Sequence, residues 1–147
     1  MKAILVNEDK SLRWDEVPNP VIKDDEVLVK IEAAALNRAD LMQREGNYPP
    51  PAGCPEWMGL EVAGEIVEIG EGARERSSYK VGDKVCALLG GGGYAEYVNV
   101  KYDMCMPVPK NCTLIEAAAI PEAFATAYLN LFFCVEKCMK AVLVSSC

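Results

Sequence analysis

The fold is decided by Gly59-Leu60-Glu61-Val62-Ala63-Gly64-Glu65-Ile66-Val67-Glu68-Ile69-Gly70. The valines and isoleucines of this stretch are β-branched, and such side chains favour extended backbone. We therefore expect a strand over residues 61–69. The 147 residues include no histidine. Any chemistry that this strand supports must therefore work without imidazole.

Further strand patterns lie on both sides of this stretch. Residues 26–32 alternate, with Val27, Val29 and Ile31 on one face, as in a half-buried strand. Other strands are expected over residues 2–6, 14–17, 84–89 and 94–100, the first two paired with each other. Short antiparallel strands separated by turn residues predict a mainly β domain over roughly the first 110 residues.

A helix and a stiff loop are expected between two of these strands. Good helix formers fill residues 37–45, and Gly46 stops the helix. The prolines in residues 47–53 exclude a helix interior and predict an extended loop that can hold Tyr48 in a fixed place.

The pattern changes near the C-terminus. Thr113 and Glu116 match a capping box. A short helix is expected over residues 116–120, and a second from Pro121 to about residue 135. The apolar residues 140–146 predict a strand buried on both faces. Helix, turn and strand in this order begin a doubly wound nucleotide-binding domain.

The four glycines Gly90–Gly93 do not predict a phosphate-binding loop. Such a loop needs a strand before it and a helix N-terminus after it, so that backbone amides converge on the anion. Here a strand is expected to follow. We interpret the glycines as a tight turn or bulge between strands.

Composition limits the partners. The net charge is −7 and there is no compact basic cluster, which argues against nucleic acid. Arg74 and Arg76 sit beside Glu71 and Glu75 and are interpreted as a solvated loop. We expect a cytoplasmic protein without a membrane segment, since the opening apolar run is too short for a signal peptide. The seven cysteines are interpreted as reduced thiols and not as a zinc site.

Five motifs in order resemble the medium-chain dehydrogenase/reductase superfamily. They are residues 37–51, Gly59–Gly64, Val81–Leu89, Gly92–Tyr97 and Glu116–Glu122. The chain is most similar to the zinc-independent quinone oxidoreductases. That resemblance implies a GroES-like partial β-barrel at residues 1–121, with the linker helix and first strand of an incomplete Rossmann domain at residues 122–147.

The resemblance also implies the chemistry. Relatives that bind zinc carry a cysteine where Asn37 stands and a histidine where Leu60 stands, so no zinc is expected here. The implied reaction is metal-free hydride transfer from NADPH to a small-molecule quinone or related enone. A homo-oligomer is left open.

Three site residues follow from the resemblance, and each has a structural alternative. Asn37, Tyr48 and Thr126 match positions near the nicotinamide, with Tyr48 and Asn37 as the catalytic candidates. Asn37 could instead cap its helix, Tyr48 could pack, and Thr126 could bond its own backbone. Asp40 and Glu61 are expected to be structural, with Glu61 paired to a basic residue such as Arg38 or Arg44.

The resemblance fails after residue 144. Relatives carry a glycine-rich turn there, which binds the cofactor diphosphate, whereas this chain reads Ser145-Ser146-Cys147. We therefore expect the catalytic portion of a quinone oxidoreductase, inactive as this chain alone. The alternative is a non-enzymatic GroES-like interaction or regulatory module.

Overall fold

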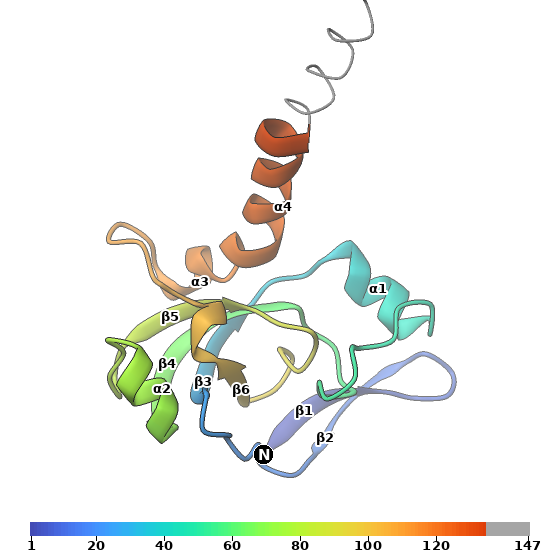
Figure 1. Cartoon of the computed structure of the whole chain (residues 1–147). Coiled ribbons are helices and arrows are strands. Elements are labelled where there is room, and N and C mark those ends of the chain that lie inside the picture. The colour runs from blue at the N-terminus through green and yellow to red at the C-terminus, as the bar shows by residue number, and fades with distance from the viewer. Residues whose placement is uncertain (135–147) are drawn as a thin grey trace, which may run out of the picture.

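The computed structural model describes residues 1–134 (Figure 1). The strands form two antiparallel sheets. Strands β1 (Lys2–Val6) and β2 (Leu12–Glu16) form a hairpin, as expected for the first pair. The larger sheet has the order β6-β3-β4-β5-β7. Its strands are β3 (Glu26–Ala34), β4 (Glu61–Ile69), β5 (Lys84–Leu88), β6 (Tyr97–Lys101) and β7 (Cys105–Pro107).

The larger sheet curls into a half-barrel around an apolar core. Val27 and Val29 of β3 pack there with Val62 and Ile66 of β4, and all four are fully buried. Strand β4 lies between β3 and β5, with Val62 opposite Ala34 and Glu61 opposite Leu88. The expected mainly β fold with a partial barrel is thereby confirmed.

Helix α1 (Arg38–Arg44) follows β3, as expected. It begins beside the N-terminal end of β4, because the backbone N–H of Ala35 donates to the carbonyl of Glu61. The capping box is also confirmed, since Thr113 accepts from the N–H of Glu116 at the start of α3 (Leu114–Ala117). A short 3-10 turn (Tyr102–Met104) links β6 to β7.

The solvated loop expected around Arg74 is wrong. Residues Glu71–Arg76 form helix α2. The distant Asp24 caps it, with a carboxylate oxygen 2.9 Å from the N–H of Gly72 and a carbonyl 2.8 Å from the N–H of Ala73. Because Ala73 is fully buried, this turn of helix is fixed by tertiary packing.

The strand expected over residues 94–100 begins only at Tyr97. Tyr94 is held elsewhere, since its N–H donates to the carbonyl of Met58 and its carbonyl accepts from Ile4. Gly91 and Gly92 have positive φ, as the expected turn requires.

The last described segment is one helical stretch, called here the C-terminal helix (residues 120–134). It comprises wide π-type turns at Ile120–Phe124, helix α4 (Ala125–Tyr128) and further π-type turns at Leu129–Cys134. In Figure 1 it projects away from the sheets. The strand expected over residues 140–146, and residue 135 of the expected helix, lie outside the described residues.

Candidate functional site

Two buried carboxylates meet where α1, β4 and the C-terminal helix converge. Asp40 of α1 is 3% exposed and Glu61 of β4 is 1% exposed. Burial of a carboxylate is unfavourable unless hydrogen bonds replace its water. Both carboxylates have such bonds, and Asn37 contributes to each of them.

Asp40 gathers three donors from three segments. It accepts from the N–H of Asn37 at 2.7 Å, the N–H of Gly59 at 3.2 Å and the hydroxyl of Tyr94 at 2.8 Å. Burial raises the pKa of Tyr94, and its hydrogen bond to Asp40 adds to that rise. The phenol therefore stays protonated and acts as a donor to Asp40.

Glu61 joins two segments that are far apart in the sequence. Its Oε1 accepts from Nδ2 of Asn37 at 2.9 Å, and its Oε2 accepts from the N–H of Glu122 at 2.8 Å. The expected ion pair of Glu61 with Arg38 or Arg44 is wrong. The half-exposed Arg44 pairs instead with Glu45, at 2.8 Å, because the buried face of α1 carries Asp40 and Gln43.

The structure brings two of the three expected site residues toward each other. Asn37 stands at the N-cap position of α1 and is tied through Glu61 to Glu122. Thr126 lies one turn beyond Glu122, and its hydroxyl donates to Oε1 of Glu122 at 3.4 Å. Thr126 is exposed, so its side chain is open to a ligand.

Tyr48 is separate from this network. It is 43% exposed, and its hydroxyl forms no hydrogen bond with any residue from 1 to 134. It follows α1 on the proline-rich loop. An exposed phenol of this kind is open to a ligand but is not held by the described residues.

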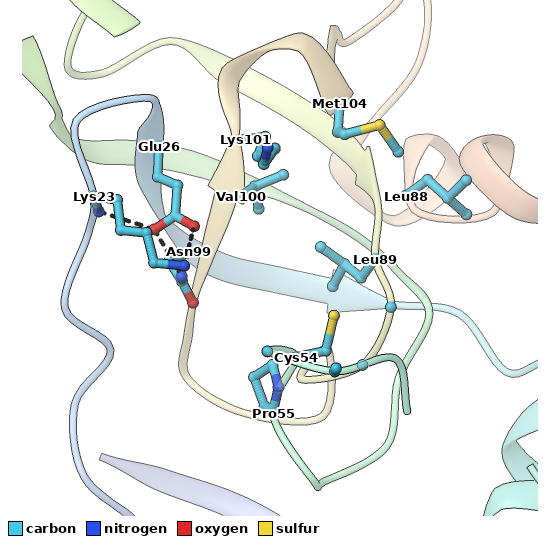
Figure 2. A pocket seen from close by; sticks show the side chains of 14 residues that line it. Lys23, Glu26, Cys54, Pro55, Leu88, Leu89, Asn99, Val100, Lys101 and Met104 are labelled. Atoms are coloured by element: carbon cyan, nitrogen blue, oxygen red, sulfur yellow. Dashed lines mark hydrogen bonds and ion pairs between the residues drawn. The ribbon is translucent and has the colours of Figure 1, made fainter. Parts of the chain in front are cut away.

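A cavity of about 390 Å³ lies elsewhere in the half-barrel (Figure 2). Its polar end has Glu26, which accepts from the N–H of Lys23 and from Nδ2 of Asn99, both at 2.9 Å. Leu88, Leu89 and Cys54 line its other end. The lining includes none of the three expected site residues.

No group of three or more metal-binding side chains occurs among residues 1–134. Two buried cysteines are poor ligands, because burial raises the pKa of Cys86 and raises that of Cys105 to about 12. Within the same residues, no helix has the length and apolarity to cross a membrane.

Sequence reasoning missed Gly59, Tyr94 and Glu122 as members of this network. Gly59 and Glu122 act through backbone N–H groups, which every non-proline residue has. Tyr94 carried a usable signal, since it is a phenol directly after the glycine turn that brings the two loops together.

Known proteins resemble this chain over most of its length. The family model "Alcohol dehydrogenase GroES-like domain" matches residues 23–110. The chloroplastic quinone-oxidoreductase homolog of Spinacia oleracea is 39% identical over 126 residues, which is 82% of this chain and 37% of that protein. The synaptic vesicle membrane protein VAT-1 homolog of Danio rerio is 39% identical over 113 residues, or 77% of this chain and 23% of that protein.

Solved structures show the same likeness. The quinone oxidoreductase from Thermus thermophilus, which was also solved in complex with NADPH, has a TM-score of 0.70 and 34% identity, over 89% of this chain. The match covers 40% of that enzyme. This chain therefore spans less than half the length of these relatives.

Proposed function

Because this chain belongs to the medium-chain dehydrogenase/reductase superfamily, through an alcohol dehydrogenase GroES-like domain, we propose that it is the catalytic portion of an NADPH-dependent quinone oxidoreductase. The relatives that are named quinone oxidoreductases support the substrate class. The observation that carries the proposal is the bond between Glu61 and Asn37. It holds an uncharged amide at the position where zinc-binding relatives carry a cysteine.

We infer a division of the chain at residue 121. Residues 1–121 form the catalytic domain, and residues 122–147 are the linker helix and first strand of a nucleotide-binding domain. Pro121 is fully buried against the sheet domain, whereas Phe124 is 67% exposed. The change from buried to exposed side chains supports a boundary there.

The residues present fit a nicotinamide ring better than a metal ion. Tyr48 and Thr126 offer exposed hydroxyls, and Asn37 offers an amide that Glu61 holds in place. These uncharged groups can form hydrogen bonds with the carboxamide of such a ring. When NADPH is bound, it supplies the hydride.

The chain's own residues then have modest tasks. Asn37 orients the ring, because its side chain cannot turn without breaking the bond to Glu61. Tyr48 orients the quinone oxygen or donates a proton to it as charge develops. Phenols are weak acids at neutral pH, so water can serve equally well as the proton source.

The test uses the chain alone and the chain completed. We expect negligible quinone-dependent NADPH oxidation by the 147-residue protein, because the part that binds the diphosphate in relatives lies outside the matched region. Residues 1–134 would then be joined to the part of the T. thermophilus enzyme that this chain does not cover. We expect this joined protein to oxidise NADPH when a quinone is added.

The matched variant is Tyr48→Phe, which removes only the hydroxyl. We expect kcat in the joined protein to fall by roughly tenfold, less than the hundredfold or more of a required general acid, because water can take over the proton transfer but not the orientation of the quinone. Binding of NADPH by the joined protein is the control for folding. A joined protein that binds NADPH but reduces neither quinones nor enones would contradict the proposal.

One observation favours a second function, a non-enzymatic interaction module. The C-terminal helix exposes several large apolar side chains, namely Phe124, Tyr128, Leu129, Leu131, Phe132 and Phe133. Exposed apolar surface of this kind commonly binds protein. A chain that stays monomeric at high concentration, measured by light scattering, would count against this alternative.

A further inference from the structure

We propose that Glu61 is a positioning residue that fixes the direction in which the C-terminal helix leaves the sheet domain, and with it the placement of Thr126 relative to Asn37. Its catalytic meaning rests on the proposed function. The two hydrogen bonds that carry it do not, since both lie within this chain.

The buried position of the Glu61 carboxylate is energetically unfavourable. Glu61 is 1% exposed, and its neighbours Leu60 and Val62 are buried and apolar. No salt bridge joins Glu61 to any described residue, so only neutral donors offset its burial. An apolar side chain would suit such a strand better. A buried acid in this place therefore indicates a task other than stability.

The two hydrogen-bond partners of Glu61 lie at the starts of two helices. Glu122 lies in the first turn of the C-terminal helix, where backbone N–H groups have no partner within the helix. Oε2 of Glu61 satisfies one of them, while Oε1 binds the side chain of Asn37. One carboxylate thus fixes the start of α1 and the start of the C-terminal helix together.

Beyond its first turn, the C-terminal helix has little support from the sheet domain. Pro121 is buried in its first turn, but the side chains from Phe124 to Phe133 are exposed. Figure 1 shows the helix extending away from the sheets. Because a helix rises about 1.5 Å per residue, a tilt of roughly 10° at Glu122 would move residue 134 by about 3 Å. The first turn therefore sets the direction of the helix.

The consequence for chemistry is geometric. Thr126 follows the helix, whereas Asn37 stays with the sheet domain. If both contact one nicotinamide, their separation decides how well the ring is held. A misplacement of about 1 Å can cost a hundredfold in rate.

The test uses the 147-residue chain without NADPH or quinone, so its outcome is independent of the proposed function. In the unaltered chain, NMR should show a scalar coupling from the amide nitrogen of Glu122 to the carboxyl carbon of Glu61. In Glu61→Met, which removes both acceptors, the amide of Glu122 should exchange with solvent at least tenfold faster. The amide of Ile66, bonded within the core, serves as the reference for global unfolding.

Two further variants complete the design. Glu61→Gln should restore slow exchange at Glu122, since its amide can accept from Glu122 and donate to Asn37 after that side chain turns over. Glu26→Met removes a second buried carboxylate, one that bonds neither α1 nor the C-terminal helix. In Glu26→Met, the rates of amide hydrogen exchange at Ile66 and Glu122 should rise by the same factor.

The exchange rates distinguish a positioning role of Glu61 from a purely structural one. If the amide exchange rates of Glu122 and Ile66 rise by the same factor in Glu61→Met, Glu61 only contributes to global stability, and the proposal is overturned. If Glu61→Met does not fold, the measurements on the unaltered chain decide whether the bond between Glu61 and Glu122 exists. A missing coupling together with fast exchange at Glu122 would then overturn the proposal.

Discussion

At the residue scale, Asp40 determines how closely two loops approach. Its bonds to Gly59 and Tyr94 bring the segment two residues before β4 against the glycine turn before β6. Gly59 has a φ of +104°, and a Cβ there would lie 2.5 Å from the amide nitrogen of Tyr94. The position therefore excludes side chains for two independent reasons.

This gives a prediction for Gly59→Ala. We expect the free energy of unfolding to fall by about 3 kcal/mol, from left-handed strain plus the steric clash. Gly82→Ala is the matched control, because Gly82 also has positive φ but no atom lies within 4 Å of the added Cβ. It should cost about 1 kcal/mol. Equal losses of unfolding free energy for the two variants, measured by urea unfolding, would show that the contact with Tyr94 adds no cost at Gly59.

The buried thiols predict a dependence of stability on alkaline pH. Burial raises the pKa of Cys105 from its ordinary value of 9.0 to about 12. Because the folded pKa is the higher one, the contribution is complete below pH 9, where both states hold the proton. It is lost as pH rises toward 12, since the unfolded thiol ionises first.

The measurement is urea unfolding between pH 8 and pH 11, approximately the range over which the thiol's contribution declines. The unaltered chain should lose stability progressively above pH 9. At pH 8, Cys105→Ala should have a lower free energy of unfolding than the unaltered chain, because packing is lost. Its free energy of unfolding should then decline less steeply with pH. The stability of the variant should still decline somewhat with pH, because burial also raises the pKa of Tyr94. Parallel slopes for both proteins would contradict the assignment to Cys105.

At the element scale, helix α2 shows how distant residues create local structure. Its first-turn N–H of Gly72 is capped by Asp24, which lies 48 positions earlier in the chain. We expect Asp24→Ala to cost about 1 kcal/mol and to expose the α2 amides to solvent exchange. Arg76→Ala removes only the 3.5 Å ion pair to the same carboxylate and should cost less than about 0.5 kcal/mol. Equal losses of unfolding free energy in Asp24→Ala and Arg76→Ala would show that the ion pair, and not the cap, stabilises α2.

The same elements show what sequence could and could not predict. The alternation in β3 and the β-branched residues of β4 correctly placed the central strands, because both signals are local. Helix α2 was missed because its cap comes from Asp24. The partners of Glu61 were missed because one of them is the backbone N–H of Glu122, 61 positions away. A motif can identify an acid in a strand, but only the fold shows which amide reaches it.

At the scale of the whole molecule, the sheet domain presents one projecting helix among residues 1–134. The first turn of this helix is buried against the sheets at Pro121, whereas the side chains from Phe124 to Phe133 are exposed. The proposed division at residue 121 and the Glu61 bonds belong together. The domain holds Asn37, the helix holds Thr126, and one carboxylate connects them.

The central claim is that this domain directs hydride transfer from NADPH. The most direct measurement is the deuterium content of the NADP⁺ formed by the joined protein from NADPH deuterated on one or the other face of C4. We predict a single-faced result, in which one labelled cofactor yields NADP⁺ without deuterium and the other yields NADP⁺ that retains it. NADP⁺ with mixed label from both cofactors, or no quinone-dependent oxidation at all, would contradict the account.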